Sequence, residues 1–175
     1  MIKDNQSFLN RLHIVLDVCV FVLSYIEAWN LKFRSPFFDG VGVMSFKEYM
    51  FALAFIVPGY LVLYSALHLY APKRVMGRRY EIGEIIKANT LGVLVFLTAL
   101  FVLKEVDFSR EMIFIFYVIN IVNGVAMRMC IRYFLRFIRR NGYNQKHILL
   151  IGYSRAAEHF IDRVTSNPQW GYLIR

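Results

Sequence analysis

The sequence predicts an α-helical membrane protein, with four transmembrane helices followed by the start of a Rossmann-like α/β domain. Three observations support this prediction: four long apolar segments, a run of arginines after the fourth, and a strand-like segment that leads into a glycine turn. The composition agrees with it, because 58% of the residues are hydrophobic, more than in an ordinary soluble domain.

Each apolar segment approaches the roughly 20 residues with which a helix crosses about 30 Å of hydrocarbon. The segments are 12–31, 49–71, 88–103 and 112–127. The third and fourth need their amphipathic flanks, with Lys87 and Arg128 reaching the membrane interface. The alternative is one buried soluble bundle, but soluble helices should show polar faces. The first segment is long, carries acids and lacks a cleavage motif, so we interpret it as a retained anchor.

The distribution of positive charge predicts the orientation. Lysines and arginines concentrate in the N-terminal head, in the loop between the second and third segments, and after the fourth segment. The positive-inside rule therefore predicts that both termini are cytoplasmic. We expect the protein to be a multi-pass protein of a bacterial inner membrane.

Five arginines follow the fourth apolar segment at a spacing that predicts one cationic helical face, a stalk at the membrane surface. They are Arg128, Arg132, Arg136, Arg139 and Arg140. The formal net charge of +9 is concentrated in this part of the chain. Basic residues beside a bilayer contact anionic lipid headgroups, so we expect these arginines to do so. The sequence has no nucleic-acid-binding motif, and we expect no nucleic-acid partner.

Four polar residues inside the apolar segments have two interpretations. Asp17 and Glu27 are ten positions apart, too far along one helix to form a paired-carboxylate site. Either could serve a small proton-coupled transporter, or both could be bonded to neighbours near the two ends of the segment. Asn120 and Asn123 are expected to bond across to another helix rather than to bind a ligand.

The last part of the chain has the order strand, turn, helix, strand. Residues 147–151 form a short apolar run, 156–165 have helical spacing, and 171–174 begin a second strand. This order predicts the beginning of a βαβ unit with a parallel sheet. We therefore expect two domains: residues 1–140, comprising four helices and the stalk, and residues 141–175, an incomplete Rossmann-like start.

The turn before the predicted helix can be compared with the dinucleotide-binding fingerprint. Gly152 and Ala157 match its first and last positions, but Ser154 replaces the glycine that lets the backbone approach a pyrophosphate. Gly152, Ser154 and Ala157 are therefore weak candidates for a nucleotide loop. Two cysteines are too few for a disulfide framework or a zinc site, so no metal site is predicted.

Several stretches together resemble the bacterial polyprenyl glycosylphosphotransferases of exopolysaccharide and O-antigen synthesis. The resemblance rests on residues 69–70, 81–88, 136–142, 146–152 and 167–172, so it extends over the chain. Members of this family have four N-terminal spans, an arginine-rich stalk and a Rossmann-like domain that opens with a similar strand and glycine.

The resemblance implies a function for the parent enzyme. The family transfers a sugar-1-phosphate from a UDP-sugar to undecaprenyl phosphate, with Mg²⁺, in a catalytic domain C-terminal to the Rossmann-like domain. We expect this chain to be the anchoring module without that domain, so no catalytic residue and no cofactor is assigned to it. The expected partners are the lipid bilayer and further copies of the chain, with the substrates bound only by the missing domain. The alternatives are a free-standing four-span transporter and a nucleotide-sensing membrane module.

Overall fold

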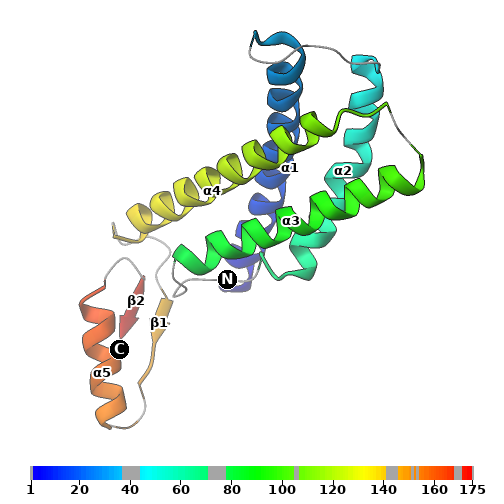
Figure 1. The fold of residues 1–175 in the computed structure, drawn as a ribbon. Helices are drawn as coiled ribbons and strands as arrows, with labels where there is room; N and C mark the ends of the chain where they lie inside the picture. The colour runs from blue at the N-terminus through cyan, green and yellow to red at the C-terminus, as the bar shows by residue number, and fades with distance from the viewer. Residues whose placement is uncertain are drawn as a thin grey trace. The chain divides into compact units, whose positions relative to one another are not determined.

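The computed structural model describes residues 2–36, 44–70, 78–104, 107–140, 146–150, 152, 154–167 and 171–174. Within these ranges the elements are α1 (Ile2–Arg34), α2 (Phe46–Ala66), α3 (Arg78–Val102), α4 (Arg110–Arg140), β1 (Lys146–Ile148), α5 (Arg155–Thr165) and β2 (Tyr172–Ile174) (Figure 1).

The chain divides into two compact units, Met1–Met127 and Arg128–Arg175, which are considered separately below. The division falls inside α4, whereas the domain boundary predicted from the sequence follows residue 140. Helix α4 is continuous across the observed division, and the boundary after residue 140 stays a prediction.

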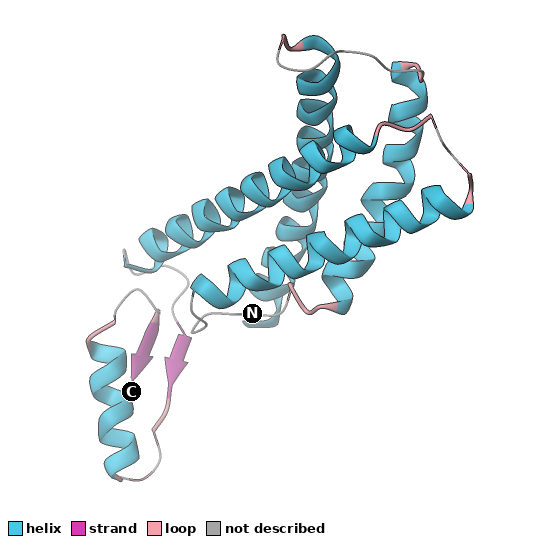
Figure 2. Cartoon of the chain, in the orientation of Figure 1, coloured by secondary structure: helices cyan, strands magenta, loops and turns pink. Residues whose placement is uncertain are grey.

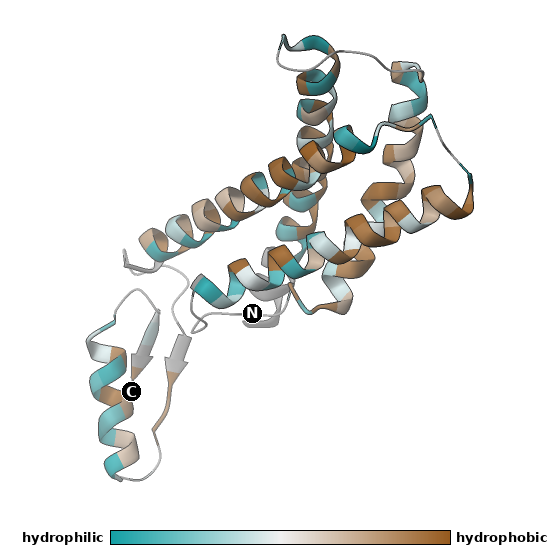
Figure 3. Ribbon diagram, viewed as in Figure 1, coloured by the Kyte–Doolittle hydropathy of each residue, from teal (hydrophilic) through white to brown (hydrophobic). Residues whose placement is uncertain are grey.

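Four helices are long and apolar enough to cross a membrane, as predicted. The candidate spans are Asn10–Arg34, Phe46–Ala66, Arg79–Val102 and Arg110–Ile138. The third and fourth extend well beyond their apolar centres, so each contains the amphipathic flank that the sequence predicted. Figure 3 shows that hydrophobic residues predominate along these helices. In the most apolar 18-residue stretch of each span at most 33% of the residues are buried inside the protein, so most of this apolar surface has no protein cover. That exposure is expected of helices solvated by lipid and is incompatible with the soluble-bundle alternative.

Local signals explain how α2 begins and how α2 and α3 end. Ser45 precedes α2, and its backbone N–H donates to the Glu48 carboxylate at 2.5 Å, which satisfies one of the donors left open at a helix start. After α2, His68 adopts a left-handed φ of 53°, and after α3, Lys104 adopts a φ of 57°. Glycine normally occupies such positions because it has no Cβ to clash. Pro58 lies inside α2, on its exposed side.

Aromatic rings hold α1, α2 and α4 together in the first unit. Phe21 of α1 contacts Tyr60 and Tyr64 of α2, with ring centroids 5.1 Å apart in each pair. Phe116 of α4 contacts Tyr25 of α1 at 5.5 Å and Tyr60 at 5.9 Å, both edge to face. Figure 1 shows α3 running obliquely across α1 and α2. The geometry suits aromatic pairs, which prefer tilted and T-shaped contacts.

The second unit contains the predicted order of strand, helix and strand (Figure 2). Strands β1 and β2 pair in parallel, with Lys146 opposite Tyr172 and Ile148 opposite Ile174. The connecting helix α5 is amphipathic and buries Ala157 and Val164. A parallel pair needs such a crossover, because the chain must return to the same end of the sheet before its next strand begins.

Candidate functional site

The first polar cluster of the membrane unit lies in its interior, between α2, α3 and α4. The Nδ2 atom of Asn120 donates to the Oδ1 atom of Asn89 at 2.6 Å. The Nδ2 atom of Asn89 in turn donates to the hydroxyl of Tyr64 at 2.9 Å and to the carbonyl of Ile85 at 2.9 Å. Both asparagines have 0% exposure. Because lipid offers amide groups no hydrogen-bond partner, the two asparagines bond to each other and to protein groups. These bonds add to the van der Waals packing that holds α2, α3 and α4 together.

This cluster is not fully satisfied among the described residues. The Oδ1 atom of Asn120 and the hydroxyl of Tyr60 are both buried without a hydrogen-bond partner there. Amides and phenols of this kind supply no nucleophile and no acid–base pair, so the arrangement positions helices rather than performing chemistry.

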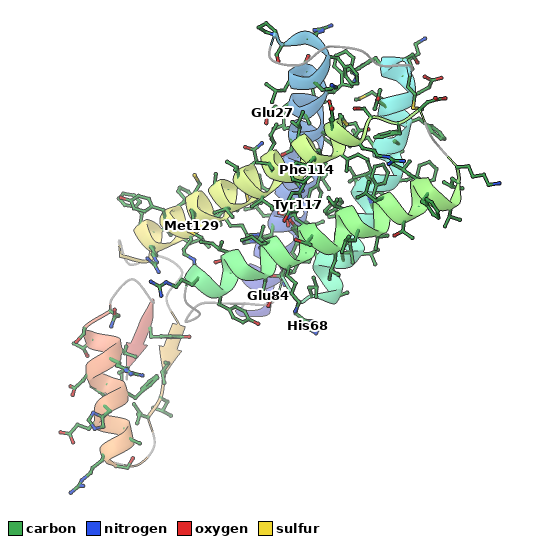
Figure 4. The ribbon with its side chains drawn as sticks, in the orientation of Figure 1. Glu27, His68, Glu84, Phe114, Tyr117 and Met129 are labelled. Carbon is green, nitrogen blue, oxygen red and sulfur yellow. The ribbon has the colours of Figure 1, made fainter. Side chains whose placement is uncertain are left out.

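A second cluster joins α1 to α4. The Nδ2 atom of Asn123 donates to the hydroxyl of Ser24 at 3.1 Å and to the Oε2 atom of Glu27 at 2.8 Å. Together with the Asn120 contact, these bonds confirm the expectation that Asn120 and Asn123 bond across to other helices. Glu27 extends from the C-terminal half of α1 (Figure 4).

The two acids of α1 lie in different environments. Asp17 is 1% exposed, whereas Glu27 is exposed and contributes to the wall of an open pocket. The pocket has a volume of about 440 Å³ and is lined by Glu27, Asn30, Leu31, Arg34, Ser35 and Ile119. The two carboxylates therefore do not form a catalytic pair. Among the described residues no group of histidines, cysteines and acids could hold a metal ion.

An ion pair ties α1 to the start of α4. The ammonium of Lys32 bonds to the Oε2 atom of Glu111, and the Lys32 side chain is only 7% exposed while that of Glu111 is 68% exposed. Lys32 directly follows the apolar segment 12–31, and nothing local in the sequence indicates that a lysine at this end of the segment will be covered. Its partner lies 79 positions away in the chain.

The arginines of the stalk do not share one exposed face. Arg128 is 3% exposed, and Arg132 and Arg136 are partly buried. The side chains of Arg139 and Arg140 lie outside the described residues. A buried Arg128 has little surface left for a lipid headgroup, whereas headgroup contact by the other four stays a prediction.

The turn between β1 and α5 has only part of a phosphate-binding geometry. Gly152 has a left-handed φ of 89°, which its lack of a Cβ allows. The hydroxyl of Ser154 accepts the N–H of Ala157 at 3.2 Å, so Ser154 serves as the N-cap of α5. A side chain thus occupies the place where the fingerprint needs bare backbone, and one helix N–H is already bonded.

Comparison with known proteins identifies the family. A family model described as a CoA-binding domain matches residues 65–174, well over half of the chain. The chain belongs to this CoA-binding domain family. No curated protein and no solved structure gives a significant match.

The CoA-binding domain match begins in the last turn of α2 and ends at the last residue of β2. It therefore includes α3 and α4 as well as β1, α5 and β2. This domain occurs in bacterial sugar transferases of the polyprenyl glycosylphosphotransferase type. This finding supports the resemblance noted from the sequence as far as a domain shared with bacterial sugar transferases. No match to a named relative identifies the specific enzyme family.

Sequence reasoning missed two members of the interior cluster of this CoA-binding-domain protein, Asn89 and Tyr64. Asn89 carried a usable signal, because an amide within an apolar span is expected to find a partner on another helix. Tyr64 carried none, because a tyrosine in an aromatic-rich helix looks the same whether its hydroxyl is bonded or not.

Proposed function

We propose that this chain is the membrane-anchoring N-terminal module of an enzyme that transfers sugar-1-phosphate from a UDP-sugar to undecaprenyl phosphate, in exopolysaccharide or O-antigen biosynthesis. The observation that carries the proposal is the extent of the family match. A single family match covers two candidate membrane-spanning helices and the strand–helix–strand segment after them, and the domain occurs in bacterial sugar transferases.

The mechanism proposed for this module is positional. Helix α4 runs without a break from a membrane span into the segment before β1, so the α/β part begins close to the membrane. A lipid-linked acceptor is confined to the bilayer, and an enzyme held at the same surface meets it at a high effective concentration. The chemistry, and any Mg²⁺ that it needs, is assigned to a catalytic domain outside these residues.

We further propose that β1, α5 and β2 open a Rossmann-like domain, because a parallel pair joined by a helix is the beginning of that fold. The residues of its turn fit a CoA or nucleotide phosphate only in part. Gly152 has the required backbone conformation and Arg155 begins α5, but Ser154 occupies the position of the second glycine. We therefore build no step on a bound CoA, and the turn remains a candidate for weak nucleotide binding.

The proposed setting is a bacterial inner membrane with both termini in the cytoplasm, and the proposed assembly is a homo-oligomer. The orientation can be tested with single cysteines at Lys104 and Ser166, after Cys19 and Cys130 are replaced by serine. All four positions are exposed. In intact cells a membrane-impermeant maleimide should label the outer residue, at position 104, and spare position 166. The reverse pattern would refute the orientation.

The proposed function is tested on the native gene product in its own membranes. An antibody against residues 35–48 should detect a species well above 20.6 kDa, the mass of these residues. The same membranes, enriched with that antibody, should transfer labelled sugar phosphate from a UDP-sugar to undecaprenyl phosphate. Residues 1–175 alone should be inactive in this assay. A native species of 20.6 kDa without a co-purifying transferase would contradict the proposal.

Burial of Asp17 favours a second candidate, proton-coupled transport, because an ionisable residue inside a span is often functional. The variants Asp17→Asn and Glu27→Gln distinguish the two candidate functions. A transporter should lose uptake with one of these changes, whereas the sugar-phosphate transfer of the native enzyme should be retained by both.

A further inference from the structure

The surface of α4 after its membrane span is aromatic rather than cationic. Tyr133 is 78% exposed, Phe134 is 61% exposed and Phe137 is 60% exposed, and Cys130 is exposed beside them. At about 100° per residue, these four side chains share a sector of roughly 100° around the helix. We call this sector the aromatic face.

The arginines lie on the other side of the helix. Arg128, Arg132 and Arg136 fall in a sector centred roughly 150° from the aromatic face. Their burial agrees with this geometry, because Arg128 is 3% exposed and the other two are partly buried. The apolar and polar faces alternate along the C-terminal turns of α4 (Figure 3).

The aromatic face continues a stripe that begins within the span. Phe114 is 68% exposed, Val118 is 48% exposed and Val122 is 59% exposed, each four residues after the one before. The exposed positions continue in the same four-residue steps from Val122 through Ala126 to Cys130. Each four-residue step turns about 40° around the helix, so the exposed stripe winds by roughly 160° between Phe114 and Cys130. It is unbroken from the apolar span, where lipid covers it, to the aromatic face.

Distances along α4 indicate the depth of the aromatic face. From Arg110, where the helix begins, Tyr133 lies about 35 Å along the axis and Phe137 about 40 Å. The hydrocarbon core is about 30 Å thick, and the bilayer with its headgroups about 40–45 Å. Tyr133, Phe134 and Phe137 therefore fall in the interfacial layer of the second leaflet, where tyrosine is enriched in membrane proteins.

We propose that the aromatic face of α4 is a membrane-binding surface. Tyr133, Phe134 and Phe137 insert among the lipid headgroups and upper acyl chains, and Arg128, Arg132 and Arg136 lie on the other side of the helix. The arginine-rich segment is then a buried end of the span and not a free stalk in water. This inference does not depend on the proposed sugar-phosphate transfer.

The test places a fluorescent probe on single cysteines in the full chain, reconstituted in phospholipid vesicles. Cys19 and Cys130 are first replaced by serine, which is a mild change because both are exposed. The test variants are Tyr133→Cys, Phe134→Cys and Phe137→Cys. The matched control is Leu135→Cys, next to the aromatic face in sequence but about 100° or more away from Phe134 around the helix.

The three test probes should lose fluorescence to spin-labelled lipids whose label sits high on the acyl chain, and they should resist an aqueous quencher. The probe at position 135 should respond less to the lipid labels. Quenching of all four probes from water alone would overturn the proposal in favour of a solvated stalk. Protection of the three test positions from both quenchers would also overturn it, because a protein surface would then cover the aromatic face.

Discussion

Asn120 of α4 donates a hydrogen bond of 2.6 Å to Asn89 of α3, in a position where neither side chain is exposed. The two residues are 31 positions apart, and Asn89 extends the contact to Tyr64 of α2. One amide pair thus connects three of the four long helices. Other polar contacts join these helices, including that of Thr90 with Tyr117 at 3.0 Å, but the amide pair is fully buried among apolar groups, and we expect it to favour one register of the helices.

A double-mutant cycle with Asn89→Leu and Asn120→Leu should detect this contact. Each single change leaves the other amide buried without its partner, and we expect it to lower the free energy of unfolding by about 1 kcal/mol. The double mutant should lose less than the sum, with a coupling energy of about 0.6 kcal/mol, the average for such bonds in membranes. Unfolding in mixed micelles measures all three values. Strict additivity would show that the contact contributes nothing.

Gly92 should not tolerate a methyl group. A Cβ atom at this position would lie 2.6 Å from two ring atoms of Tyr60, closer than real Cβ contacts. The Tyr60 ring is 3% exposed and packed against Phe21 and Phe116, so it has little freedom to move. We expect Gly92→Ala to lower the free energy of unfolding by about 1–3 kcal/mol, the usual range for overpacking.

The control for Gly92 is Gly83→Ala in the same helix. An added Cβ at Gly83 meets nothing within 4 Å, and alanine is the better helix former by roughly 1 kcal/mol. Thermal unfolding of the two variants in the same detergent should therefore shift in opposite directions. A similar loss of stability in both would mean that α3 and α2 do not approach each other closely at Gly92.

His68 should be replaceable by glycine with a gain in stability. Its φ of 53° costs roughly 1 kcal/mol for a residue with a Cβ, and glycine adopts this conformation without strain. The His68 side chain is exposed, so little packing is lost. We expect His68→Gly to raise the midpoint of thermal unfolding and His68→Ala to leave it unchanged or lower it. Equal midpoints for the glycine and alanine variants would contradict this explanation.

The pair formed by Lys32 and Glu111 should show its asymmetry in mutants. Lys32→Gln removes a covered charge and leaves an exposed carboxylate that water can solvate, whereas Glu111→Gln leaves the covered ammonium without its countercharge. We therefore expect Glu111→Gln to destabilise the protein more than Lys32→Gln does. Comparing the two unfolding free energies tests the order, and the double variant Lys32→Glu with Glu111→Lys should recover part of the loss.

The limits of sequence reasoning are visible in the arginine segment. Periodicity correctly predicted one helix that carries the arginines on one side. It also favoured an exposed cationic face, whereas Arg128 is buried and the exposed residues are Tyr133, Phe134 and Phe137. Helical spacing shows which residues share one side of a helix, but it does not show which side is exposed.

The sequence by itself determined the four membrane spans, the strand–helix–strand order after them and the missing glycine at Ser154, because each depends on local composition or on spacing along the chain. Only the tertiary structure decided that Asn89 pairs with Asn120, that Gly92 faces Tyr60 and that Lys32 is covered. These contacts join helices far apart in the sequence. They depend on the angle and register at which the helices pack, and many residues set that geometry together.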